Sequence, residues 1–138
     1  MADERAPAAT LPVPRALPPQ RLCGGDELVE RGRAIVFDVV RFHEPARAFA
    51  LRFDGRVVCY LNRCVHVPTE LDWQPGEFLD AGREFIICSI HGAAYEAASG
   101  RCIGGPCGRG GLVTIDVVER DGSVWWLPTR DTRPPFED

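Results

Sequence analysis

Lysine is absent from this sequence, so its 16 basic residues are all arginines, and they stand against 20 acidic residues. The formal net charge is -4 at pH 7. Binding to the phosphates of nucleic acids requires a basic face, which a mildly acidic chain with scattered arginines does not offer. We therefore expect no nucleic-acid partner.

Long apolar runs are missing as well. No stretch approaches the roughly 18 apolar residues that a transmembrane helix needs, so we expect no membrane span. The amino-terminal sequence M-A-D-E-R-A-P-A-A-T lacks the charged and then apolar layout of a secretion signal, and no twin arginine is present. These absences predict a cytoplasmic protein.

Helical periodicity is scarce, because no window with a helical repeat exceeds about ten residues. Short β-rich runs occur instead, at residues 34–40, 48–53, 57–61, 84–88, 112–118 and 124–127. Asp-Gly pairs at 54–55 and 121–122 each separate two such runs, which is a strong hairpin signal. The sequence therefore predicts an all-β fold, a small antiparallel barrel or sandwich.

Proline is concentrated at the amino terminus, where residues 1–20 hold five of the 12 prolines together with many alanines. Such a composition predicts a flexible Pro/Ala-rich extension. The length of 138 residues suits a single domain. We expect that domain over residues 21–130 and a flexible carboxy-terminal tail over residues 131–138.

Histidine is rare, and two of the three histidines stand close to cysteines. His66 lies two residues after Cys64, and His91 lies three residues after Cys88. Each Cys/His pair follows a predicted strand, so a loop at the end of that strand could bring both side chains to one point. Two thiolates and two imidazoles suit an iron–sulfur, zinc or copper site rather than calcium or magnesium.

The segments C-V-H and C-S-I-H-G resemble the Rieske iron–sulfur signature, C-x-H…C-x-x-H, and the resemblance extends over roughly residues 22–127. Gly92 after the second histidine, the S-G turn at 99–100, the G-G-P loop at 104–106 and the closing hairpin at 112–127 support it. The resemblance implies a Rieske-like all-β fold, with two cluster-binding loops at one end of the barrel or sandwich.

The resemblance further implies one [2Fe–2S] cluster. In this family one iron takes two cysteines, here Cys64 and Cys88, and the other takes two histidines, here His66 and His91. The implied function is that of an electron carrier, a soluble Rieske-type ferredoxin, whose partners are a reductase and a terminal oxygenase or other oxidoreductase. The chain alone is not expected to be an enzyme, because the catalytic iron of an oxygenase needs two more histidines and only His43 remains.

Two features of the family members in cytochrome bc complexes are absent. Those members carry an additional cysteine in each ligand loop and join the two in a disulfide, whereas this chain has Thr69 and Ile90 at the matching positions. They also carry a serine soon after the second histidine, where this chain has Ala93 and Ala94. With fewer donors near the cluster, the sequence predicts a potential toward the lower end of the Rieske range of about -150 to +300 mV.

Two other functions remain open on the sequence. The chain could be an accessory or small subunit of a larger reductase, similar to the small subunit of nitrite reductase. It could instead hold a structural zinc with the same Cys₂His₂ set, although zinc patterns favour C-x-x-C pairs.

The remaining cysteines and His43 are expected to lie outside the site. Cys23 and Cys59 are predicted to pack as small apolar residues. Cys102 and Cys107 are predicted to be thiols beside the G-G-P loop; a disulfide between them stays open but is disfavoured in a reducing compartment. His43 is predicted to be an exposed loop residue.

Overall fold

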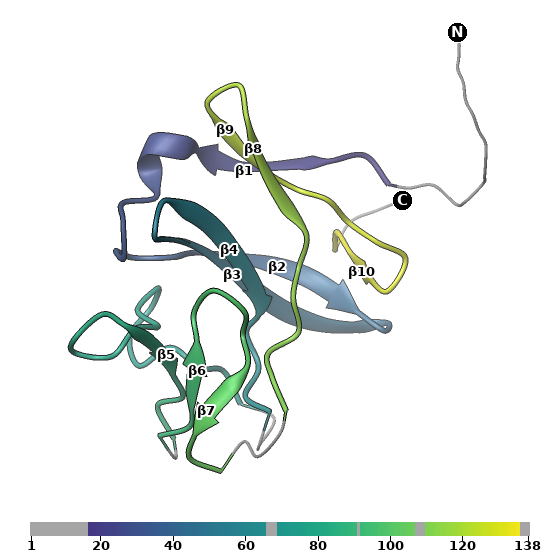
Figure 1. The fold of residues 1–138 in the computed structure, drawn as a ribbon. Helices are drawn as coiled ribbons and strands as arrows, with labels where there is room; N and C mark the ends of the chain where they lie inside the picture. Colours follow the sequence, from purple (N-terminus) through teal and green to yellow (C-terminus); the bar gives the residue numbers. More distant parts are fainter. Residues whose placement is uncertain (1–16, 66–68, 91, 107–109, 136–138) are drawn as a thin grey trace, which may run out of the picture.

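A computed structural model of the chain describes residues 17–65, 69–90, 92–106 and 110–135. Three antiparallel sheets lie above one another, and Figure 1 shows them as an upper, a central and a lower layer. Apart from a 3-10 turn at Gly25–Glu27, the regular secondary structure of the described residues is β-strand. The predicted all-β fold is confirmed.

The upper layer pairs the first strand of the described chain with a hairpin near its carboxy-terminal end. Its order is β1 (Gln20–Gly24), β9 (Ser123–Trp126) and β8 (Val117–Arg120). The predicted turn at Asp121 and Gly122 joins β8 to β9, with φ angles of 54° and 76° at these residues. Two positive φ angles are typical of a type I′ turn, whose twist matches that of the paired strands.

The central layer contains the longest strands. Its order is β10 (Thr132–Arg133), β2 (Ile35–Arg41), β3 (Glu44–Phe53) and β4 (Arg56–Leu61). The second predicted turn, at Asp54 and Gly55, joins β3 to β4 with φ angles of 55° and 81°. Thr132 and Arg133 belong to the segment 131–138 that the sequence assigns to a tail; here they pair with β2, and Thr132 is buried.

The lower layer is made of three short strands. These are β5 (Phe85–Ile87), β6 (Ala94–Glu96) and β7 (Cys102–Gly104), in that order. The sequence did not predict β7, and its predicted strand over 112–118 becomes β8 only from Val117 onward. Residues 112–116 instead cross from the lower to the upper layer, because Leu112 packs in the lower core and Ile115 in the upper core.

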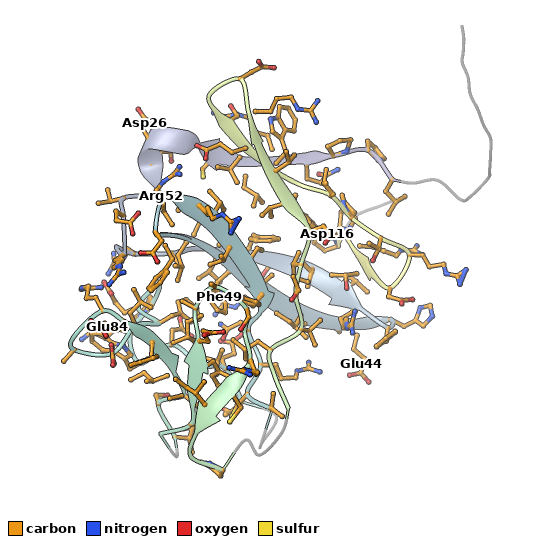
Figure 2. The ribbon with its side chains drawn as sticks, viewed as in Figure 1. Asp26, Glu44, Phe49, Arg52, Glu84 and Asp116 are labelled. Atoms are coloured by element: carbon orange, nitrogen blue, oxygen red, sulfur yellow. The ribbon has the colours of Figure 1, made fainter. Side chains whose placement is uncertain are left out.

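Alternating side-chain size along β3 allows the central sheet to be covered on both faces. Ala48 and Ala50 belong to the core under the upper layer, whereas Phe49 belongs to the core above the lower layer, together with Tyr60 of β4. Phe49 stacks on Phe78 with 3.7 Å between ring centroids, and Figure 2 places Phe49 in the middle of the molecule. Small residues of β3 face one layer and its aromatic residue faces the other, so the same strand contributes to both cores.

Arg52, near the end of β3, ties the central sheet to the upper layer. Its guanidinium donates to the carbonyls of Gly25 and Leu28 at 2.9 and 2.8 Å, and to the carboxylate of Glu119 at 2.7 Å. Figure 2 shows Arg52 beneath the 3-10 turn that carries Asp26. These contacts fix the end of the molecule at which β4 begins, and the candidate site lies at the end where β4 finishes.

Candidate metal centre

Two loops at the lower end of the molecule carry the predicted cysteine ligands (Figure 1). Cys64 follows β4 and Cys88 follows β5, and their exposed fractions are 3% and 1%. The two loops contact each other directly, because the Ser89 N–H donates to the Leu71 carbonyl at 3.2 Å. The fold therefore brings together the two cysteines that the sequence singled out.

One backbone hydrogen bond joins each cysteine to a later residue of its own loop. The Cys64 N–H donates to the Thr69 carbonyl at 2.8 Å, and the Cys88 N–H donates to the Ala93 carbonyl at 2.8 Å. Gly92 has a φ angle of 73°, which glycine adopts without steric strain. Both cysteines are thus held by the backbone of their own loops.

Tyr95 in β6 is a site residue that sequence reasoning missed. Its hydroxyl oxygen lies 3.6 Å from Cys64 Sγ and accepts a hydrogen bond from the Val65 N–H at 3.2 Å. Burial, followed by the contact with Cys64, raises the pKa of Tyr95 to about 12. The hydroxyl is therefore protonated at neutral pH and can donate to a thiolate at Cys64. Its position in the sequence, after the second loop, gives no signal of contact with the first.

The G-G-P loop packs closely on the second ligand loop. A Cβ atom at Gly105 would lie 2.8 Å from Ala93 Cα and 3.1 Å from the Gly92 carbonyl oxygen. Gly105 also has a φ angle of 82°, in the left-handed region. Only glycine satisfies both demands, so this loop can cover the second ligand loop at van der Waals distance.

The other cysteines have different surroundings. Cys23 and Cys59 are buried free thiols in the upper core, as predicted, and burial raises the pKa of both thiols, that of Cys59 well above its ordinary value. Cys102 is disulfide-bonded, so its prediction as a thiol is wrong. That prediction rested on the expected compartment and not on geometry. Cys107, the other cysteine of that prediction, lies outside the described residues.

The described residues supply two of the four predicted ligands. His66 and His91 lie outside the described residues, and no group of three or more metal-binding side chains occurs within them. Cys64 and Cys88, desolvated and placed on adjoining loops, are the soft donors that an iron–sulfur cluster requires. The described half of the site therefore fits such a cluster. His43 is exposed in the turn between β2 and β3, as predicted.

Three exposed apolar side chains, which we call the tip residues, stand on the segments that form the site. Val65 in the first loop, Ile90 in the second loop and Ile103 on β7 have exposed fractions of 41%, 54% and 44%. Exposed apolar side chains on the segments of a site are available for contact with another molecule. No helix in the described part of the chain has the length and apolar character needed to cross a membrane.

Comparison with known proteins gives one family match and several structural ones. A family model described as the Rieske [2Fe-2S] domain matches residues 20–128. The ferredoxin of carbazole 1,9a-dioxygenase from Nocardioides aromaticivorans IC177 has a TM-score of 0.63 and 23% identity, over 80% of this chain and 98% of that chain. No curated protein matches.

Two larger proteins share the fold over part of their length. A chain of the reduced complex between oxygenase and ferredoxin in carbazole 1,9a-dioxygenase has a TM-score of 0.64 and 23% identity, over 87% of this chain and 33% of that chain. The quaternary ammonium Rieske monooxygenase CntA has a TM-score of 0.64 and 19% identity, over 80% of this chain and 31% of that chain. At these identities the structural matches establish a common fold.

Proposed function

The chain belongs to the Rieske [2Fe-2S] domain family, and from this premise we propose that it is a one-electron carrier of the ferredoxin type. The cofactor of the family is a [2Fe–2S] cluster. The observation that carries the proposal is the pair of buried cysteines, Cys64 and Cys88, on adjoining loops at one end of the three-layer fold. The similar fold of a carbazole dioxygenase ferredoxin supports it.

We assign the ligands as Cys64 and Cys88 on one iron and His66 and His91 on the other, the asymmetric set of this family. When bound, the cluster supplies a couple that accepts and releases one electron. The chain excludes water from both cysteine sulfurs, as their burial indicates. The Tyr95 hydroxyl oxygen lies 3.6 Å from Cys64 Sγ. With a thiolate ligand at Cys64 it would donate a hydrogen bond to the sulfur, which would favour the more negative, reduced state.

The proposed partners are a reductase that supplies the electron and a terminal oxygenase or other oxidoreductase that receives it. The chain is similar to a ferredoxin of carbazole 1,9a-dioxygenase, and a ferredoxin of this system has been seen in complex with its oxygenase. The tip residues offer an apolar surface around the ligand loops on which such partners could dock. A cytoplasmic location and the lack of an enzymatic activity of its own belong to the same proposal.

Analysis of iron and acid-labile sulfide in anaerobically purified protein tests the proposal. We expect two irons and two sulfides per chain, as the family cofactor requires, and reversible reduction by one electron. Cys88→Ser should abolish the cluster, because a thiolate ligand is lost. Cys23→Ala, which removes a buried thiol in the upper core, should retain it. One tightly bound zinc without sulfide would overturn the proposal in favour of a structural zinc site.

A further inference from the structure

A buried amide stands directly beside the first ligand loop. Among the described residues, Asn62 and Thr132 are the buried polar residues, each with an exposed fraction of 3%. Asn62 immediately follows β4 and precedes Cys64 by two residues. Burying an amide is unfavourable unless its polar atoms find partners, so the contacts of Asn62 indicate its role.

Asn62 connects the central sheet to the far end of the first ligand loop. Its backbone N–H donates to the Arg47 carbonyl on β3 at 2.8 Å. Its side-chain Oδ1 accepts from the Leu71 N–H at 2.7 Å, and its Nδ2 donates to Asp72 Oδ1 at 3.2 Å. The amide therefore holds the far end of the segment that contains Cys64 beside the end of β4.

The backbone held by Asn62 also reaches the second ligand loop. Leu71 is fully buried. Its N–H donates to Asn62 Oδ1, and its carbonyl accepts from the Ser89 N–H at 3.2 Å. Ser89 directly follows Cys88. A continuous path of hydrogen bonds thus runs from the sheet through Asn62 and Leu71 to the residue beside the second cysteine.

We propose that Asn62 is a positioning residue, which sets the separation and orientation of Cys64 and Cys88 by holding Leu71 between the two ligand loops. The inference rests on the ligand assignment proposed above. Two sulfurs on one metal must keep a fixed separation, and groups that orient ligands without touching the metal govern how tightly it is held. Ser89 contacts the Leu71 carbonyl and Asn62 contacts the Leu71 N–H, so the contact with Ser89 does not replace the amide.

An amide is required because the position demands one acceptor and one donor on the same short side chain. Aspartate would keep the acceptor for Leu71 but would place a second carboxylate against Asp72. Leucine has a similar size but offers neither group. Asn62→Asp therefore retains half of the arrangement, and Asn62→Leu retains none.

Both variants are compared with Thr132→Val, which removes the other buried polar group. Thr132 lies in β10, and its hydroxyl oxygen accepts from Arg41 Nη1 at 2.9 Å, apart from both ligand loops. Three quantities are measured on each cluster-loaded protein: the rate of iron transfer to a chelator, the electron paramagnetic resonance spectrum of the reduced state, and the unfolding temperature.

We expect Asn62→Leu to release iron about 10-fold faster than the parent protein, as ligand-orienting contacts commonly do when lost, with altered g values in its spectrum. Asn62→Asp should show a smaller change in the same direction. Thr132→Val should lower the unfolding temperature and leave the release rate and the spectrum unchanged.

Parent-like release and spectrum in Asn62→Leu would overturn the inference, and so would equal changes in Thr132→Val, since general stability would then explain them. If Asn62→Leu does not fold, Asn62→Asp decides, and a parent-like result in that variant overturns the inference. Failure of the proposed function is distinct, because it appears in the parent protein as a missing cluster.

Discussion

A single hydroxyl group, that of Tyr95, stands 3.6 Å from the sulfur of Cys64. A hydrogen bond to a thiolate ligand strengthens as the sulfur becomes more negative, so it stabilises the reduced state more than the oxidised state. Tyr95→Phe should therefore lower the redox potential. A hydrogen bond of about 1 kcal/mol corresponds to about 40 mV for one electron, and protein-film voltammetry at neutral pH measures the shift.

Tyr60→Phe is the matched control for this prediction. Tyr60 is also buried, and its hydroxyl donates to the Ala97 carbonyl at 2.7 Å rather than to a sulfur. Its removal should leave the potential unchanged. Equal shifts in both variants would mean that burial of the rings, and not the hydroxyl of Tyr95, governs the potential.

Gly105 is a second residue whose identity the structure explains. Gly105→Ala should loosen the G-G-P loop, because the new Cβ would lie 2.8 Å from Ala93 Cα, and we expect iron release to become several-fold faster, roughly within the 10-fold range of such contacts. Gly122→Ala has a comparable φ angle, 76°, but nothing lies within 4 Å of its Cβ. It therefore carries the backbone strain alone, about 1 kcal/mol, and should not change iron release. Chelator assays on both variants separate the clash from the strain.

At the scale of elements, Tyr60 links the central sheet to the turn after β6. Burial raises the pKa of Tyr60 to about 12, above its ordinary value of 10.0. The folded state thus favours the protonated form, so its contribution to stability is complete below pH 10 and is lost as pH rises toward 12. We expect the free energy of unfolding to fall by up to about 1.4 kcal/mol per pH unit in that window.

Urea unfolding at a series of alkaline pH values measures this effect. Tyr60→Phe should be less stable at neutral pH by about 1–3 kcal/mol, because the Ala97 carbonyl loses a buried donor. The same variant should lose stability less steeply above pH 10. A parallel decline in the variant and the parent protein would assign the alkaline loss to other groups, among them Tyr95.

Elements with strong local signals were predictable from the sequence. The Asp-Gly turns require positive φ angles that few other pairs adopt, and the central strands alternate clearly, so both hairpins were found. β1, β7 and β10 were not predicted; β7 and β10 have only three and two residues, which carry no period of their own and form only against a neighbour. The run at 112–118 alternates because it passes two cores in turn, which sequence periodicity cannot distinguish from a strand.

The residues of the candidate site also differ in how far the sequence could predict them. Cys64 and Cys88 carry a spacing pattern that can be read along the chain, and the fold brings their loops together. Tyr95 and Asn62 carry no such pattern, since Tyr95 contacts a loop 31 residues earlier and Asn62 contacts Leu71 across an irregular loop of no fixed spacing. The low potential predicted from Ala93 and Ala94 stays a prediction, and Tyr95 is a donor that it did not include.

At the scale of the whole molecule, the ligand loops and the Arg52 contacts lie at opposite ends of β4. If electrons leave at the loop end, a negative charge placed there should slow transfer to an anionic acceptor, and a charge at the other end should not. Ile90→Glu should therefore slow the reduction of ferricyanide about threefold at low ionic strength, as Coulomb repulsion in water implies. Added salt should reduce the effect.

Val29→Glu is the control for this measurement by stopped-flow spectroscopy. Val29 is 66% exposed and precedes Glu30, whose backbone forms an isolated β-bridge with that of Arg52 at the far end of the molecule. It adds the same charge to the chain and should leave the rate unchanged. Equal slowing by both variants would show that the net charge of the protein, and not the position of the added charge, governs the rate. No slowing by either variant would mean that electrons leave from another part of the molecule.

The first and last strands of the described chain lie away from the ligand loops. β1 begins, and β10 ends, on the side of the molecule remote from the lower end (Figure 1). A linker, an affinity tag or a thiol for grafting onto gold, joined before Gln20 or after Arg133, would attach the protein on the side remote from the ligand loops. Immobilised molecules would then present their ligand loops to the solution, and two copies fused in tandem would each keep that face accessible to a soluble enzyme.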